Sequence, residues 1–366
     1  MSVIGLISTN YGGEKLGKLV ENRPVASVPF GGRYRLIDFS LSSMVNSGIT
    51  SVGVITPVNY RSLADHLNMG REWGLNKKQG GMFMLPGAQH SFRNLTSRFS
   101  VQDIAQNREF FARADQDTVL FCGANRIYNM DFRPAIKRHI ETDAQITLIY
   151  RDLADTTDAN GLYLDVNSSN TVIGIRSEAK KSDKVFLDAM LISRKLVMNF
   201  IDWYANLGYA DLMDILAGNL DRLHVRAWCF TGYEHAIDTG ADYMKVSKDL
   251  LRPEVQDQLF NADRPILTKT QDSPPAKYLP GAIVKNSMIA ASCKIQGTVE
   301  NSTLFRNVEI GKGAIVRNCV LMQHCIIEDG AVVENLICDK NCRISGEVKI
   351  SGSEKKPFVM ARGMEL

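Results

Sequence analysis

Arg33 and Arg35 stand one residue apart in a segment whose chemistry suits an anion. They follow Pro29 and the pair Gly31-Gly32, which cannot continue a regular element and therefore predict a tight loop. Two guanidinium groups in such a loop could bind a negatively charged ligand. The same spacing also suits two arginines on a solvated surface, so an anion site and a plain surface loop both stay open.

A second kind of chemistry is offered by the seven cysteines of the chain. Cys338 and Cys342 form a CxxxC pair without a partner pair, which is a weak signal for a metal site. Packed thiols are the favoured interpretation. An odd number of cysteines without paired short spacings indicates reduced thiols, as in a cytoplasmic protein.

The elements that position the arginine loop follow it directly. Asp38 is predicted as the N-cap of a helix, and Gly48 as the left-handed residue that ends it. Apolar residues recur at helical spacing from just before Asp38, namely Ile37, Leu41, Met44 and Val45. Residues 49–56 are apolar and β-branched and predict the next strand of a parallel sheet.

Up to about residue 250, short apolar runs alternate with helical stretches. Strands are predicted at Val3–Ser8, Ser51–Thr56, Thr118–Cys122, Gln145–Tyr150, Leu187–Arg194 and Arg226–Thr231. Helices are predicted at Leu63–Leu67, Ile104–Ala114, Arg133–Glu141, Leu212–Leu220 and Asp242–Leu251, the last of them stopped by Pro253. This alternation predicts a Rossmann-like α/β domain with a mostly parallel, doubly wound sheet.

After Pro280 the period changes to six residues. One series comprises Val308, Ala314, Val320, Ile326, Val332, Cys338, Ile344 and Ile350, and a second comprises Ile315, Leu321, Ile327 and Val333. Such a period predicts a hexapeptide β-helix with three short strands per coil, stacked around one core. The chain is therefore divided into a domain at 1–252, a proline-rich linker at 253–280 and a β-helix at 281–366.

Composition excludes several classes of protein. A net charge of +3 gives no support for general nucleic-acid binding, and no apolar stretch approaches the ~20 residues that span a bilayer. The N-terminal apolar run lacks a basic flank and a small-residue cleavage site, so it is predicted as a first strand. We expect neither a nucleic-acid nor a membrane partner.

The string PFGGRYRLIDFSLSSMVNSGI resembles the segment that follows the nucleotide-binding loop in bacterial and plant glucose-1-phosphate adenylyltransferases. The resemblance extends over nearly the whole chain and is dense at residues 24–60, 118–132 and 228–251. It implies a nucleotidyltransferase-like domain followed by a left-handed β-helix. It also implies the family's reaction, in which glucose 1-phosphate attacks the α-phosphorus of ATP. That reaction requires a metal held by carboxylates and a glycine-rich loop for the triphosphate.

Several positions depart from the family's nucleotide-binding pattern. The loop Ser8–Gly17 keeps one glycine pair but carries Glu14 and lacks the family's arginine, so an ordinary strand-helix turn is favoured. The family's lysine two residues before the AVPFGG string is replaced by Val25, and the glutamine that reads adenine is replaced by Pro57. A proline has no side-chain donor, so it cannot replace that contact.

The family's metal and sugar positions have changed as well. Its two metal-binding aspartates align with Asn125 and Ala236. The asparagine offers one neutral oxygen as a ligand, and the alanine offers none. The family's tryptophan near the second aspartate aligns with Glu234. The segment that supplies a serine and a tyrosine to the family's sugar site aligns with residues 189–193, whose sequence differs. Lys180 is either a shifted remnant of the phosphate-binding lysine or part of a solvated charge run.

The changed positions imply the non-catalytic, regulatory subunit type that some Gram-positive bacteria pair with a catalytic adenylyltransferase for glycogen synthesis. We expect no cofactor, no catalytic residue and no metal, and a hetero-oligomer, a tetramer, with the catalytic subunit. In the family the basic loop contributes to an effector site, which makes Arg33 and Arg35 the candidate anion-binding residues. The alternative is an active adenylyltransferase with a shifted metal site built from Glu234, Asp238 and Asp131. A hexapeptide acyltransferase would explain the C-terminal region alone, with His324 as its candidate histidine.

Overall fold

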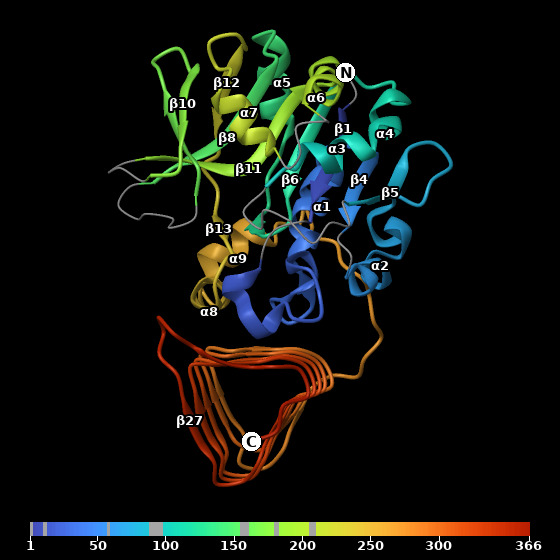
Figure 1. The fold of residues 1–366 in the computed structure, drawn as a ribbon. Helices are drawn as coiled ribbons and strands as arrows, with labels where there is room; N and C mark the ends of the chain where they lie inside the picture. Colours follow the sequence, from blue (N-terminus) through green and yellow to red (C-terminus); the bar gives the residue numbers. More distant parts are fainter. Residues whose placement is uncertain are drawn as a thin grey trace. The chain divides into compact units, whose positions relative to one another are not determined.

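The computed structural model describes residues 3–9, 13–56, 59–87, 98–153, 161–178, 183–204 and 210–366. It divides into two compact units, which we describe separately (Figure 1). The first unit comprises residues 1–12, 39–234 and 264–267. The second comprises residues 13–38, 235–263 and 268–366. The division of the chain at residues 252 and 280 stays a prediction.

A parallel core of four strands organises the first unit. β1 (Val3–Ser8) lies between β4 (Ser51–Thr56) and β6 (Thr118–Gly123), and β5 (Gly81–Pro86) pairs with β4. Ser8 stands opposite both Ile55 and Gly123, so the carboxyl ends of these strands share one edge of the sheet. The predicted α/β fold with a mostly parallel sheet is confirmed.

The other half of the sheet is mixed. β11 (Lys184–Ser193) runs antiparallel to β6 and to β8 (Ile146–Asp152), while β12 (Val225–Cys229) runs parallel to β8. The hairpin strands β9 (Tyr163–Val166) and β10 (Val172–Arg176) extend the edge. β11 carries a register shift between Phe186 and Met190, and Asp188 within it has a φ of 51°. This irregularity aims the Asp188 side chain differently from its neighbours.

Helices cover both faces of this sheet. Ile4 and Leu6 of β1 share a core cluster with residues of α3, α6 and α7, while a Cβ placed on Gly5 would lie 2.6 Å from Met44 Sδ of α1. Successive strand residues thus face different helices, as the pleat requires. The helices are α1 (Leu36–Asn46), α2 (Arg61–Leu67), α3 (Val101–Gln106), α4 (Arg108–Ala112), α5 (Arg133–Glu141), α6 (Arg194–Tyr204) and α7 (Leu212–Ala217).

Two predicted helices differ in the structure. A single helix at Ile104–Ala114 is wrong, because the chain leaves the helical conformation at Asn107 (φ −104°, ψ 26°). The Asn107 amide donates to the carbonyls of Pro86 and Asp103 at 2.9 and 2.8 Å, which stabilises the break. Asp38 is not the N-cap, because α1 begins at Leu36. Its carboxylate instead accepts the N–H of Arg35 at 2.9 Å from inside the first turn.

The arginine loop belongs to the second unit and forms a small hairpin. β2 (Pro29–Phe30) pairs with β3 (Tyr34–Arg35), and the turn between them uses φ values of 56° at Gly31 and 77° at Gly32. Both φ values favour glycine. Two 3₁₀ helices precede the hairpin, η1 (Glu14–Leu19) and η2 (Val25–Ser27), and a third, η3 (Asn68–Trp73), lies in the first unit.

The second unit also contains α8 (Gly240–Asp249), which begins with a capping box between Thr239 and Asp242. The prediction that this helix is the last one is wrong, because α9 (Pro253–Leu259) follows it. Pro253 starts α9 rather than merely stopping α8, since proline suits the first position of a helix.

The remainder of the second unit is a β-helix, as predicted, with three parallel five-stranded sheets forming the faces of a triangular coil (Figure 1). The strands of the first face are β14 (Lys277–Tyr278), β17 (Lys294–Ile295), β20 (Glu309–Ile310), β23 (Ile326–Ile327) and β26 (Arg343–Ile344). Those of the second are β15 (Ile283–Lys285), β18 (Thr298–Glu300), β21 (Ile315–Arg317), β24 (Val332–Glu334) and β27 (Lys349–Ser351). Those of the third are β16 (Met288–Ile289), β19 (Thr303–Leu304), β22 (Val320–Leu321), β25 (Leu336–Cys338) and β28 (Phe358–Met360).

The coils are shorter than a strict six-residue period requires. Ile310, Ile327 and Ile344 are partners in successive coils, so each of these coils contains 17 residues rather than 18, and the coil from Ile295 to Ile310 contains 15. One face in each 17-residue coil therefore advances by five residues instead of six. As a result the predicted first row leaves the core at Ile326 and Val332, while Ile327 and Val333 of the second row are buried. In the part of the chain that is described, no helix is long and apolar enough to cross a membrane.

Candidate functional site

The edge where β1, β4 and β6 end is the place where α/β folds bind ligands. The segment after β6 contains Ala124, Asn125 and Arg126, and all three side chains are buried. Arg126 opens the short strand β7 (Arg126–Tyr128). The residue that the resemblance aligns with the first metal ligand, Asn125, therefore lies next to a buried arginine.

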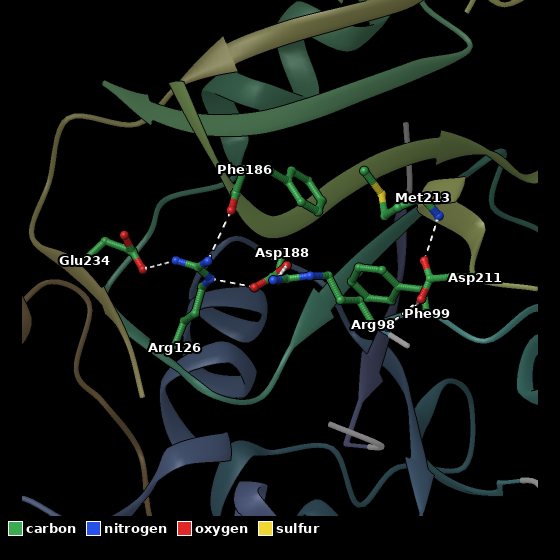
Figure 2. Close-up of polar contacts among 8 residues, drawn as sticks. All are labelled: Arg98, Phe99, Arg126, Phe186, Asp188, Asp211, Met213 and Glu234. Atoms are coloured by element: carbon green, nitrogen blue, oxygen red, sulfur yellow. Dashed lines mark hydrogen bonds and ion pairs between the residues drawn. The ribbon is translucent and has the colours of Figure 1, made fainter. Parts of the chain in front are cut away.

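Arg126 is the centre of a buried ion-pair network (Figure 2). Its Nε donates to Asp188 Oδ2 at 2.7 Å and its Nη1 donates to Glu234 Oε1 at 2.6 Å. Its Nη2 donates to the carbonyl of Phe186 at 3.2 Å. Only 2% of the Arg126 side chain is exposed, against 0% for Asp188 and 4% for Glu234. The guanidinium is thus the buried counter-charge of two carboxylates.

Asp188 has a second partner, because Arg98 forms an ion pair with its other oxygen (Figure 2). Burial by itself would raise the pKa of Asp188, but the charges and hydrogen bonds of Arg98 and Arg126 hold it below its ordinary value. Asp188 is therefore ionised and neutralised. The irregular turn of β11 at this residue is what brings its carboxylate between the two arginines.

A third carboxylate, Asp211, secures the segment that carries Arg98. Its Oδ1 accepts the N–H of Met213 at 2.7 Å, which caps α7, and its Oδ2 accepts the N–H of Phe99 at 3.0 Å (Figure 2). The N–H of Arg98 also donates to it. Asp211 thus acts in local structure, and its oxygens are engaged by N–H groups.

Two residues of the alternative, shifted metal site also have arginine partners. Glu234 is bonded to Arg126, as described above. Asp131 accepts two hydrogen bonds at 2.8 Å from Arg133, and these bonds lower its pKa. The third, Asp238, lies in the second unit. Magnesium prefers carboxylates that converge on the ion, and a carboxylate held by a guanidinium has to exchange that partner first.

The other positions of the family pattern lie in apolar surroundings or outside the described residues. Val25 in η2 is 3% exposed. A Cβ on Gly13 would lie 2.7 Å from Cγ2 of Val25, so the Val25 side chain packs closely against the backbone at Gly13. Ala236 is 4% exposed at the end of β13 (Glu234–Ala236). Pro57, Lys180 and the loop residues 10–12 lie outside the described residues, as does the side chain of Glu14.

A second candidate site surrounds the arginine loop within the second unit. Gly32 lies against the β-helix, since a Cβ there would be 3.9 Å from Ala290 Cβ and 4.0 Å from the carbonyl oxygen of Leu304. Burial lowers the pKa of Arg306, and the charge of Arg33 lowers it further. The predicted loop therefore brings its cations close to those of the coils.

Lys340 is the clearest sign of this concentration of charge. Burial, and then the charges of Arg35, Arg23 and Arg362, lower its pKa to about 8 against the opposing effect of Asp339. Arg23 also forms a buried ion pair with Asp339. We refer to Arg23, Arg33, Arg35, Arg306, Lys340 and Arg362 as the basic cluster.

Sequence reasoning found part of this cluster. The sequence indicates Arg33 and Arg35. Two other arginines of the β-helix, Arg317 and Arg343, pair with Glu300 and Glu328 along the coils. The sequence does not indicate Arg23, Arg306 or Lys340, because nothing in it shows which distant residues lie beside the loop.

Comparisons with known proteins agree with both parts of the fold. Residues 12–172 match the family described as Nucleotidyl transferase, and residues 274–357 match the family described as GlmU-like, C-terminal hexapeptide. Glycogen biosynthesis protein GlgD of Geobacillus stearothermophilus is 37% identical over 361 residues, which cover 99% of this chain and 96% of that protein. The protein of the same name from Bacillus subtilis is 31% identical over 99% of this chain and 96% of its own length. A glucose-1-phosphate adenylyltransferase of Pseudothermotoga lettingae is 32% identical over 86% of this chain and 76% of its own length.

Proposed function

The chain belongs to the family of the glucose-1-phosphate adenylyltransferases and the glycogen biosynthesis proteins GlgD, and we propose that it is a regulatory, non-catalytic subunit in glycogen biosynthesis. It assembles with a catalytic adenylyltransferase subunit as a heterotetramer and changes that enzyme's kinetics. The reduced thiols expected from the cysteine pattern agree with a cytoplasmic location.

The observation that carries this proposal is the guanidinium of Arg126 between Asp188 and Glu234. Nucleotidyl transfer between two anions needs a divalent cation, and this buried network already neutralises its carboxylates with arginine. The two aligned ligand positions, Asn125 and Ala236, add no carboxylate. A missing metal clamp costs several kcal/mol at the transition state, hence at least about three orders of magnitude in rate.

The test is an assay of the purified chain with ATP, Mg²⁺ and glucose 1-phosphate, alone and mixed with a catalytic adenylyltransferase subunit. The chain alone should form no ADP-glucose above background. The mixture should co-purify as one species and turn over at a rate different from that of the catalytic subunit alone. Appreciable ADP-glucose from the isolated chain would overturn the proposal, as would a mixture that neither associates nor changes rate.

The regulatory role gives the basic cluster a function, which is to bind an anionic metabolite of the phosphate class. The charge of Arg33 lowers the pKa of Arg306, and the charges of other arginines of the cluster lower the pKa of Lys340, so a bound anion would relieve this repulsion. Titration calorimetry with pyrophosphate tests this part. The doubly substituted Arg33→Ala, Arg35→Ala chain should bind it at least about tenfold more weakly, since each lost charge-assisted hydrogen bond contributes about 1.5–3 kcal/mol.

A matched control is available in Arg317→Ala, because Arg317 lies on the β-helix but pairs with Glu300 at 3.0 Å. This variant should bind pyrophosphate as the unchanged chain does. Equal weakening by both sets of substitutions would indicate general attraction to a positively charged protein and not a site at the loop.

A further inference from the structure

Three cysteine thiols meet inside the β-helix. The sulfur atoms of Cys325, Cys338 and Cys342 all lie within 4.8 Å of one another, and each side chain is buried. The sequence offered Cys338 and Cys342 as a weak metal signal, with packed thiols as the favoured interpretation. The structure adds a third thiol, that of Cys325 in the preceding coil, and so strengthens the signal for a metal site.

A fourth sulfur lies beside this group. Cys338 stands opposite Met360 in the pairing of β25 with β28, and its Sγ lies 3.6 Å from Met360 Sδ. Cys325 and Cys342 precede β23 and β26, which are neighbours in the first face, so these two cysteines stack in successive coils. The fold thus gathers a soft donor from each of four positions at one corner of the coil.

We propose that Cys325, Cys338 and Cys342, with Met360 as the fourth donor, bind one thiophilic cation, Zn²⁺ or Cu⁺. Thiolate and thioether sulfur are the donors that these two ions favour in proteins. Four sulfur atoms around one ion at about 2.3 Å stand about 3.8 Å apart, so the thiols, which lie within 4.8 Å of one another, need to approach by at most about 1 Å. Two adjacent coils and the C-terminal strand would then be joined through the ion.

The thiols of the site carry protons that a bound cation would displace. The Sγ atoms of Cys325 and Cys342 donate hydrogen bonds to the backbone carbonyls of Asp339 and Ala361 at 3.0 and 3.1 Å, so binding of the ion would release these protons. Three thiolates around Zn²⁺ would carry a net negative charge. Lys340 lies on the turn between Cys338 and Cys342, and Arg23, Arg35 and Arg362 influence it, so positive charge is at hand to balance the site.

Burial sets the conditions of the experiment. Because the thiols are at most 1% exposed, the ion enters when the last coil opens or as the chain folds. The reduced full-length chain, freed of metal by chelator in mild urea, is therefore returned to buffer with Cd²⁺ alone as the first probe. Thiolate-to-cadmium absorption in the ultraviolet should rise and saturate at one equivalent, and a large excess of Zn²⁺ in a separate arm should reduce it, because Cd²⁺ binds thiolates more tightly than Zn²⁺ does.

The variants separate a metal site from ordinary packing. Cys342→Ala should lose the cadmium absorption, whereas Cys319→Ala, which removes a thiol buried in the same β-helix outside the cluster, should keep it. Met360→Leu keeps the volume and should weaken Cu⁺ binding by at least about tenfold while Zn²⁺ binding falls less, because a thioether suits the softer ion. An absorption that survives Cys342→Ala, or none in the unchanged chain, would overturn the proposal.

A second measurement does not depend on any variant folding. In the unchanged chain at a urea concentration that opens the coils, one equivalent of Zn²⁺ should protect Cys325, Cys338 and Cys342 from alkylation by iodoacetamide. Cys293 and Cys319 should be alkylated at the same rate with and without the ion. Mass spectrometry of the peptides gives the result, and equal labelling of all five cysteines under both conditions would contradict the site. The proposal does not depend on the function proposed above.

Discussion

Arg126 lies in the protein interior as the counter-charge of Asp188 and Glu234, so removing it would leave carboxylates buried without a partner. We expect Arg126→Met to lower the free energy of unfolding by about 3–5 kcal/mol, the usual cost of breaking a buried ion pair from one side. Urea denaturation measures this. Arg133→Met is the matched control, because Arg133 pairs with Asp131 on the exposed surface and should change stability little. Equal effects of the two substitutions would show that the Arg126 network contributes no more than a surface pair.

Restoring the two aligned carboxylates tests the catalytic interpretation at the same scale. The double variant Asn125→Asp, Ala236→Asp should still form no ADP-glucose, because the nucleotide loop and sugar contacts have changed as well. The acidic groups would also be placed at positions that are 2% and 4% exposed, which should lower stability. The measurement is turnover of ATP and glucose 1-phosphate, together with the midpoint of urea unfolding. Full turnover would show that the loop around Glu14 and Val25 is sufficient for nucleotide binding.

At the scale of elements, the 17-residue coil predicts which of two neighbouring isoleucines, Ile326 or Ile327, contributes more to stability, and the six-residue period alone does not. Ile327 faces the core at 1% exposure, whereas its neighbour Ile326 is partly exposed. Ile327→Ala should lower the free energy of unfolding by about 2–5 kcal/mol, because it leaves a cavity between stacked coils. Ile326→Ala should cost clearly less. Thermal or urea unfolding of the two variants compares them directly, and the reverse order would place the first predicted row, with Ile326, in the core of this coil.

The elements that sequence reasoning predicted well are those whose signal is local. β1 and β4 have the predicted bounds, as does α5, because a short apolar run or an amphipathic stretch between turn residues specifies each one. The break at Asn107 depends on the carbonyl of Pro86, which lies in another element. The start of α9 depends on Pro253 being used as a first helical residue, although proline stops a helix equally well.

The candidate sites depend even more on contacts between residues that are distant in the sequence, which a local pattern does not predict. Arg126 is separated by 62 and 108 residues from its partners Asp188 and Glu234, and no periodic pattern joins them. The thiol cluster was hidden for a related reason. Cys338 belongs to the first predicted six-residue row, but Cys325 and Cys342 enter the core because one face of each 17-residue coil advances by five residues.

At the scale of the whole molecule, the proposed regulation should depend on pH through Lys340. Its pKa is about 8, and a bound anion would favour the charged form and so raise that pKa. The lysine's contribution to anion binding is therefore complete below about pH 8 and is lost as the pH rises through that value. Pyrophosphate affinity measured by calorimetry should fall between pH 7 and pH 9.

The control for this pH dependence is the variant Lys340→Met, which should bind pyrophosphate more weakly at pH 7 and show a smaller change toward pH 9. The same profile should appear in the mixed enzyme, as a loss of effector response at pH 9 that exceeds any change in the rate of the catalytic subunit alone. Arg343→Met serves as the matched substitution, because Arg343 pairs with Glu328 along the coils. If Lys340→Met kept the full pH dependence, the titrating group would be the ligand and not the lysine, and the basic cluster would lose its proposed part in regulation.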